Sequence, residues 1–222
     1  MAQLTRVHQF SVSSDGFGTG EGQTRQRPFG HLEVSDLHQW VMDTSAWSHS
    51  DPPGGTMGLD DLIARSFPLG IGAEIMGRNK FASAAGPWPD DDWTGWWGDE
   101  PPFHTPVFVL THHTREPLTL GETTFNFINE SPESALKTAQ AAANGQDVRI
   151  GGGVATVRSF LEADLIDTLH IAVVPIRAER GERLWSGPED LEERYQHEVI
   201  SGSNGIVHHF FWRKLSLESI NR

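Results

Sequence analysis

The sequence feature that most constrains the fold is a run of three glycines, Gly151-Gly152-Gly153, between two apolar segments. Val148-Arg149-Ile150 precedes the run, and apolar residues at 154, 157, 160 and 161 follow it at helical spacing. Glycine lets the backbone approach a bulky group closely. The first turn of a helix offers unpaired N–H groups and partial positive charge. The run therefore indicates a strand–turn–helix unit whose turn is either a tight connection or a phosphate-binding site.

Strand-like and helix-like segments alternate along the rest of the chain. Strands are expected at 6–14, 73–76, 107–110, 123–128, 148–150 and 169–174, and helices at 32–47, 59–67, 132–144 and 154–163. The last two β-prone runs, 195–201 and 206–215, flank Asn204-Gly205, which is a hairpin signal. This order predicts an α/β fold of three layers, with a mostly parallel central sheet flanked by helices and a C-terminal antiparallel hairpin. No interdomain linker is found, so residues 1–222 are expected to form a single domain.

Composition excludes several classes of function. The chain has 17 basic and 30 acidic residues, a net charge of −13, which argues against nucleic-acid and anionic-membrane partners. It has no cysteine, so disulfides and thiolate metal sites are excluded. Neither a signal-peptide pattern nor an apolar span is found, and a cytoplasmic location is expected. A phosphate-bearing ligand would need a local basic pocket.

Two further strand ends carry polar groups. Gly77-Arg78-Asn79-Lys80 follows the run at 73–76, and Thr111-His112 follows the run at 107–110. Cations at the start of a helix oppose the helix dipole unless an anion binds there, although they could also be exposed solubilising side chains. With the glycine turn, three such junctions lie at the carboxyl ends of expected parallel strands. Open α/β sheets bind ligands at that edge.

These residues resemble a known family. Met76-Gly77-Arg78 looks like the Met-Gly-Arg turn of dihydrofolate reductases, and 148–161 with 165–176 resembles the reductase domain of bacterial riboflavin biosynthesis, the RibD C-terminal domain. Ser13-Ser14-Asp15-Gly16 and 181–185 extend the match over nearly the whole chain. The resemblance implies a dihydrofolate-reductase-like fold, NADPH as the cofactor, hydride transfer to a small molecule, and a homodimer.

The resemblance also implies roles for particular residues. Arg78, Asn79 and Lys80 match the turn that holds the cofactor phosphates, and Thr111 and His112 match the grip on the adenosine 2′-phosphate. The glycine-rich segment after Asp15 corresponds to a mobile active-site loop. The remaining residues that the resemblance places against the cofactor lie along the nicotinamide, at the Met-Gly-Arg turn or at the pyrophosphate turn: Ser11, Val12, Gly77, Gly151, Gly152, Gly153, Val154, Ala155 and Thr156.

The acceptor of the hydride is left open. Residues 24–45 contain no clear match for the buried acid of dihydrofolate reductases, and 177–181 differs from the family's Gly-x-Gly. A pterin-, pyrimidine- or flavin-precursor-like substrate fits the resemblance, and the alternative is a non-catalytic nucleotide-binding or assembly protein on the same fold. Asp15 is the candidate catalytic acid, or else it forms an Asx turn beside Gly16.

Two other features concern the substrate pocket and metal binding. The tryptophan-rich segment 88–97 is expected either to cap the substrate pocket or to contact a second copy of the chain. His112-His113 and His208-His209 are adjacent pairs. Adjacent residues on a strand point to opposite faces, so no catalytic metal is expected from them.

Overall fold

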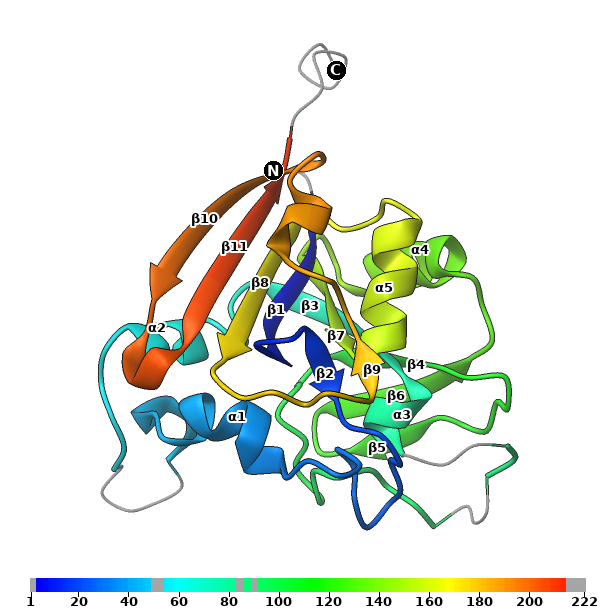
Figure 1. Cartoon of the computed structure of the whole chain (residues 1–222). Helices are drawn as coiled ribbons and strands as arrows, with labels where there is room; N and C mark the ends of the chain where they lie inside the picture. The colour runs from blue at the N-terminus through cyan, green and yellow to red at the C-terminus, as the bar shows by residue number, and fades with distance from the viewer. Residues whose placement is uncertain (1–2, 49–53, 83–85, 89–91, 215–222) are drawn as a thin grey trace.

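A computed structural model describes residues 3–48, 54–82, 86–88 and 92–214. Its centre is a nine-stranded sheet in the order β10-β11-β8-β1-β7-β3-β4-β6-β5 (Figure 1). The six neighbouring strands from β8 to β6 pair in parallel. Their bounds are β1 Thr5–Ser13, β3 Ile71–Gly77, β4 Pro106–Leu110, β6 Thr123–Ile128, β7 Asp147–Gly152 and β8 Thr168–Val174.

Antiparallel strands close both edges of this sheet. At one edge β10 (Tyr195–Ser201) and β11 (Val207–Arg213) form a hairpin, and β11 pairs with β8. At the other edge β5 (Leu118–Leu120) pairs with β6. A separate two-stranded sheet joins β2 (Phe17–Thr19) to β9 (Glu182–Arg183). The three-layer fold predicted from the sequence, with its C-terminal hairpin, is confirmed.

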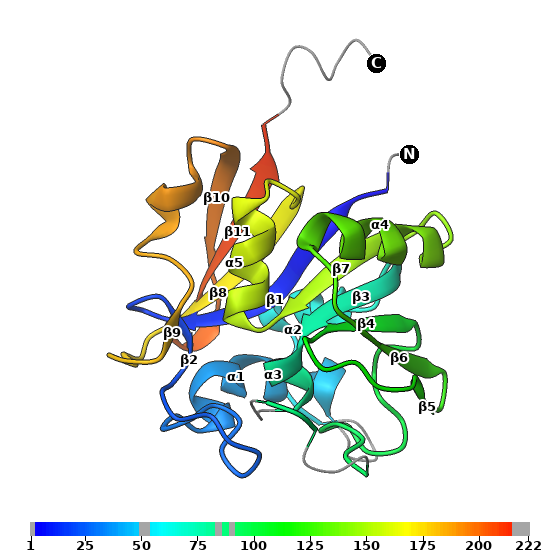
Figure 2. The ribbon, with the colours of Figure 1, turned by 90° about the vertical axis from the view of Figure 1, so that its right-hand side faces the viewer.

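Helices cover the two faces of the sheet. Helices α4 (Pro132–Ala142) and α5 (Val154–Glu162) pack on one face, which we call the α5 face. Helices α1 (Val34–Met42) and α2 (Leu59–Arg65) pack on the other, the α1 face, beside the short α3 (Arg78–Phe81), as Figure 2 shows. Three 3-10 turns complete the elements, at Ser45–Trp47, Pro188–Leu191 and Ser203–Gly205.

Alternating side chains explain why both faces are covered. On β3 and β7, Ala73, Ile75, Val148 and Ile150 join one core cluster with α4 and α5. Successive side chains of a strand point to opposite faces, so Glu74, Arg149 and Gly151 point to the α1 face. There the tryptophan-rich segment 88–97 packs on Phe81, Phe125 and Phe127. Residues 89–91 of that segment lie outside the described residues.

Some element ends differ from the sequence predictions. The expected helix at 32–47 ends at Met42 and is followed by a separate 3-10 turn. Its N-cap is Glu33, in a capping box with Asp36. Strand β7 continues into the first two glycines because its backbone keeps pairing with β3, in the register Met76 to Gly152. The final strand ends at Arg213, and Leu215 of the expected run lies outside the described residues.

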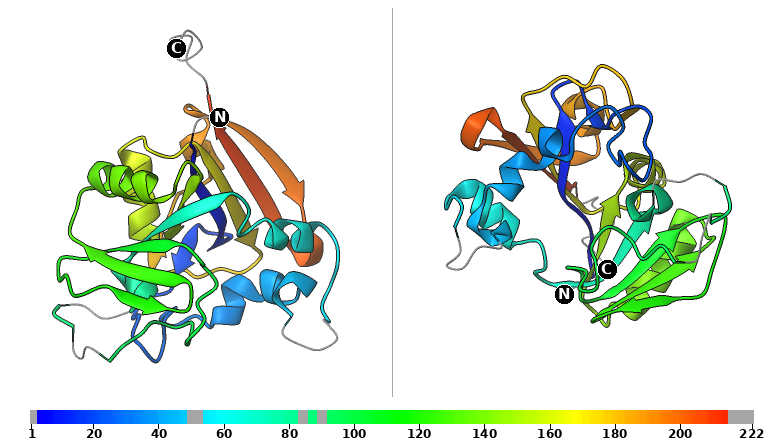
Figure 3. Two further views of the ribbon diagram at one scale, coloured as in Figure 1. Left: turned by 180° about the vertical axis from the view of Figure 1, so that it is seen from behind. Right: turned by 90° about the horizontal axis from the view of Figure 1, so that it is seen from below.

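The carboxyl ends of the parallel strands gather at one edge of the sheet, the lower edge in Figure 1 and the side facing the viewer in the right-hand view of Figure 3. The junctions after β3, β4 and β7 all lie at this edge. No helix among the described residues has the length and apolar character needed to cross a membrane.

Candidate functional site

The glycine turn forms an open cradle at the start of α5. Gly153 is the N-cap and has no side chain, so nothing within the turn accepts from the first N–H groups of the helix. A Cβ built on Gly153 would meet no atom within 4 Å. Gly152 has a φ of +102°, a conformation that glycine adopts freely. The turn can therefore admit an anionic group against the N–H groups of Val154, Ala155 and Thr156.

The turn after β3 lies against this cradle. A Cβ on Gly77 would overlap the hydroxyl oxygen of Thr156, so glycine is needed where β3 passes under the first turn of α5. Thr156 is buried, with 8% of its surface exposed. This contact brings together two of the predicted junctions.

A cleft of about 300 Å³ opens between the ends of β3, β4 and β6. It contains four of the predicted cofactor residues, Arg78, Asn79, Thr111 and His112, together with Gly86, Leu110, His113, Asn129 and Glu130. The Arg78 guanidinium lies 4.1 Å from the centre of the Trp88 ring and donates to the carbonyl of Gly86. Its Nε–H has no acceptor among the described residues. The cleft thus presents a fixed cation beside an aromatic ring.

The acid of this cleft, Glu130, has partners on α4. The Glu130 carboxylate accepts from the hydroxyls of Ser134, at 2.8 Å, and Thr138, at 3.2 Å, both on α4. His112 Nδ1 lies 3.3 Å from the side-chain oxygen of Asn129. Beside Glu130, the cleft therefore combines one arginine with hydroxyl, amide and imidazole groups, which can serve a phosphate group.

Lys80 has a different environment from Arg78. Its ammonium donates to Oε1 of Glu74 at 2.9 Å, and Glu74 is fully buried. Arg149 pairs with the other carboxylate oxygen of Glu74. Burial would raise the pKa of Glu74, but the charges of Arg149 and Lys80 outweigh it and lower that pKa. Sequence reasoning missed this group, although a glutamate and an arginine within apolar strands are the signal that could have found it.

The residues predicted along the nicotinamide are buried in β1. The hydroxyl of Ser11 accepts from the indole N–H of Trp40 at 2.9 Å. Val12 is fully buried in the core cluster of the α5 face. Because both side chains are occupied, contact with a ring at this end of β1 would use their backbone.

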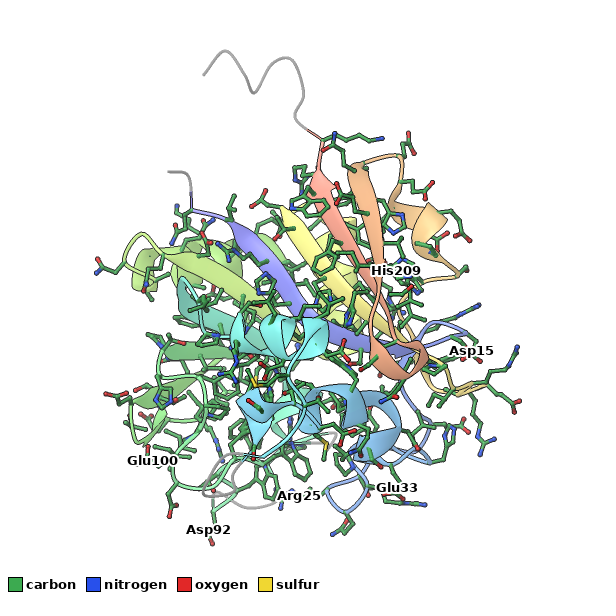
Figure 4. All side chains as sticks on the ribbon, turned by 90° about the vertical axis from the view of Figure 1, so that its left-hand side faces the viewer. Asp15, Arg25, Glu33, Asp92, Glu100 and His209 are labelled. Carbon is green, nitrogen blue, oxygen red and sulfur yellow. The ribbon has the colours of Figure 1, made fainter. Side chains whose placement is uncertain are left out.

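Asp15 is held by the loop after β8. Oδ1 accepts from the Ser13 hydroxyl at 2.6 Å and from the N–H of Ala178 at 3.0 Å, and Oδ2 accepts from the N–H of Glu179 at 2.9 Å. Burial alone would raise the pKa of Asp15, but these hydrogen bonds lower it to about 2. An ionised carboxylate at the periphery of the molecule (Figure 4) does not suit a proton donor. The contacts fit a structural role, through the backbone of 178–179 rather than an Asx turn.

Histidines form two separate pairs on the two faces of β11. His208 bonds to His170 and Asp60 on the α1 face, each at 2.9 Å, whereas His209 bonds to His197 on the other. The opposite orientation predicted for His208 and His209 is therefore confirmed. Within the part of the chain that the structure describes, no group of three or more His, Cys, Asp or Glu side chains could hold a metal ion.

The mostly parallel sheet, flanked by helices and with a cleft at its carboxyl edge, defines an α/β protein. The chain belongs to the RibD C-terminal domain family, whose family model matches residues 7–201. This family membership supports a reductase that acts on a small molecule. No curated protein matches the chain.

Solved structures share the fold. A putative riboflavin biosynthesis protein from Shewanella sp. PV-4 is 22% identical with a TM-score of 0.53, over 97% of this chain and 100% of that chain. A pyrimidine reductase-like protein from Corynebacterium diphtheriae is 13% identical with a TM-score of 0.47, over 97% of this chain and 93% of that chain. At this level of identity the first match shows the fold alone.

Proposed function

We propose that this protein is an NADPH-dependent reductase that transfers a hydride to a small heterocyclic or conjugated molecule. The observation that carries the proposal is the convergence of three junctions at one sheet edge. The open turn at Gly153 and the cleft around Arg78 each offer a phosphate-sized site, and the contact of Gly77 with Thr156 joins them. A dinucleotide phosphate has its charged groups spread in this way.

The residues present fit NADPH. The N–H groups at 154–156 would take the pyrophosphate, and Arg78 with Thr111 and His112 would take the 2′-phosphate. When bound, the reduced nicotinamide supplies the hydride. The chain's own groups bind the phosphates, orient the ring against β1 and exclude water from it.

The proposed class of hydride acceptor takes its support from the family. Membership of the RibD C-terminal domain family supports a riboflavin-precursor-like or related pyrimidine or pterin acceptor. We further propose a cytoplasmic enzyme whose residues 1–222 form one domain, and a homodimer as in the family resemblance. Asp15 is assigned to holding the 178–179 loop rather than to proton donation.

The test combines binding with turnover. Purified protein should bind NADPH, seen as a change in cofactor fluorescence, and should oxidise it in the presence of one member of a panel of pterins, flavin precursors and small enones. If NADPH does not bind, the reductase proposal fails. Binding with no oxidation across the whole panel would favour the non-catalytic nucleotide-binding alternative.

A further inference from the structure

The buried charges at Glu74, Arg149 and Lys80 lie beneath the glycine turn. Arg149 is 2% exposed, donates to the Phe67 carbonyl at 2.6 Å and lies 3.6 Å from the centre of the Phe67 ring. Glu74 accepts from both cations. Isolated buried charges are costly, so a buried acid is retained where both its oxygens are paired. Glu74 and Arg149 thus hold each other in position, and Lys80 is the most exposed of the three charged side chains.

Lys80 reaches out of this cluster. Its side chain is 26% exposed, and its ammonium has three N–H donors. Glu74 is the only acceptor that the described residues give it. Two donors are therefore available to a ligand. A flexible surface lysine would lose this orientation, but the buried carboxylate of Glu74 keeps the ammonium in one place.

The ammonium lies on the side of β7 away from the pyrophosphate cradle. A Cβ on Gly151 would lie 2.6 Å from Lys80 Nζ and would overlap the Glu74 carboxylate. Gly151 points to the α1 face, whereas α5, whose first N–H groups form the cradle, packs on the opposite face. The backbone of β7 therefore separates Lys80 from the phosphate position.

Beyond Glu74 and Arg149, Lys80 has an aromatic ring nearby and a histidine whose pKa its charge affects. Its Nζ lies 5.5 Å from the centre of the Phe103 ring. Helix α1 covers the same face of the sheet (Figure 2) and carries His38, whose ring lies 5.0 Å from that of Phe29. Burial and, to a smaller degree, the charge of Lys80 lower the pKa of His38 to about 4, so His38 is neutral. An oriented ammonium beside an aromatic ring suits a planar ligand that carries an oxygen of partial negative charge.

We propose that Lys80, positioned by Glu74, is a catalytic residue that faces the hydride acceptor and not the cofactor phosphates. The inference rests on the proposed reductase function and names the acceptor as a planar conjugated carbonyl compound. Hydride addition to the conjugated carbon breaks the C=C or C=N π bond, and its electron pair moves to the carbonyl oxygen. Lys80 donates to that oxygen, and the proton it gives up is replaced from water. A positioned donor of this kind contributes about 100- to 1000-fold to the rate.

Matched methionine variants distinguish a cation that binds the cofactor phosphates from one that contacts the hydride acceptor. Lys80→Met should bind NADPH within about threefold of the unchanged protein, whereas Arg78→Met should weaken NADPH at least tenfold in the same fluorescence titration. With any acceptor found in the panel, Lys80→Met should lower kcat/KM about 100-fold. If Lys80→Met weakens NADPH as much as Arg78→Met does, Lys80 is a phosphate ligand and the inference is wrong. A wild-type protein that does not bind NADPH would instead contradict the proposed function.

A second readout needs no turnover. The chain has only three lysines, at 80, 137 and 214, so biosynthetic labelling with 13C-lysine gives three Cε signals that single Lys→Met variants assign. Adding lumazine, a planar dioxopteridine, to the NADP⁺-saturated protein should shift the Lys80 signal and leave the other two unchanged. An unchanged Lys80 signal would overturn the assignment.

The role of Glu74 is tested by the pKa of Lys80 in the same spectra. Burial lowers the pKa of Lys80, and the charge of Glu74 opposes that shift. Glu74→Gln should therefore lower it further, and Glu74→Asp, which keeps the charge, should restore part of the difference. A Lys80 pKa that does not move in either folded variant would show that Glu74 does not position the ammonium.

Discussion

At the scale of single residues, the three glycines at 151–153 have three different reasons to be glycine. Gly151 lies against the Glu74 carboxylate, Gly152 has a positive φ, and Gly153 borders open space. The first two are required by the fold. Glycine is required at 153 only if a ligand fills the space. Gly151 and Gly152 therefore serve the fold, whereas Gly153 would serve ligand binding.

This difference gives a paired prediction. Gly151→Ala should destabilise the protein by about 1–3 kcal/mol, because the new methyl group displaces a buried ion pair. Gly153→Ala should change stability by about 0.5 kcal/mol or less but should weaken NADPH, since its methyl group enters the cradle. Urea denaturation and cofactor titration of both variants measure the two effects. Equal loss of stability in both would contradict this interpretation.

Asp15 supports a stability prediction. Asp15→Asn should cost about 1 kcal/mol, because one oxygen that accepts from the Glu179 N–H becomes a donor. The folded pKa of Asp15, about 2, is below its usual value of 3.8, so its contribution is complete above pH 4 and disappears as the pH falls toward 2. Denaturation of wild type and variant at pH 7 and pH 2.5 should show the gap closing. A proton-donor role would instead give a kcat that falls in the variant with stability unchanged.

At the scale of elements, a directed chain of hydrogen bonds joins α2 to three strands. The backbone N–H of Gln9 on β1 donates to Nδ1 of His170 at 3.1 Å, so the ring proton of His170 is on Nε2 and points to His208. His208 in turn donates to Asp60 of α2 at 2.9 Å. Both histidines are buried, at 4% and 0% exposed. Each histidine thus accepts one hydrogen bond and donates one, and Asp60 also accepts from the N–H and the hydroxyl of Ser203.

Removing His208 from this series of hydrogen bonds should weaken the attachment of α2 to the sheet and lower the stability of the protein. His208→Leu leaves the buried N–H of His170 without its acceptor and removes one of the donors to the buried Asp60 carboxylate, which keeps its hydrogen bonds from Ser203, at a cost of about 1–3 kcal/mol. The matched control is Gln196→Leu, at an exposed position of the neighbouring strand β10, which should change stability by about 0.5 kcal/mol or less. Chemical denaturation measures both. Equal stability of the two variants would mean that the chain does not hold α2.

The elements also show how far the sequence could be interpreted. Strong apolar runs and glycine or proline boundaries predicted β4, α4, β8 and the hairpin, because those signals are local. The short strands β2, β5 and β9 were not predicted, since each is defined by a partner that is distant in sequence or by a single turn. Likewise, Arg78, Thr111 and Gly153 could be placed at strand ends, whereas the pairing of Lys80 with Glu74 depends on which side of β7 each side chain points.

At the scale of the whole molecule, four histidines whose pKa is lowered by burial or partial burial predict loss of stability in mild acid. Burial is the largest cause that lowers the pKa of His8, His38 and His209, each to about 4, and that of His170 well below its usual value. The unfolded chain therefore binds more protons than the folded chain below about pH 6.5, and stability falls as the pH drops from 6.5 toward 4. Thermal unfolding should show a lower Tm at pH 5 than at pH 7.5. A Tm that is flat over this range would contradict the buried, neutral state of these histidines.

We propose a single nucleotide site at three strand ends, and direct binding tests that proposal. Fluorescence titration of the purified protein with NADPH and with NADH should give at least tenfold tighter binding of NADPH, because only NADPH carries the 2′-phosphate that Arg78 would meet. Arg78→Ala should remove most of that preference, since a charge-assisted contact is worth about 1.5–3 kcal/mol. Equal affinity for the two cofactors, or binding of neither, would contradict the site described here.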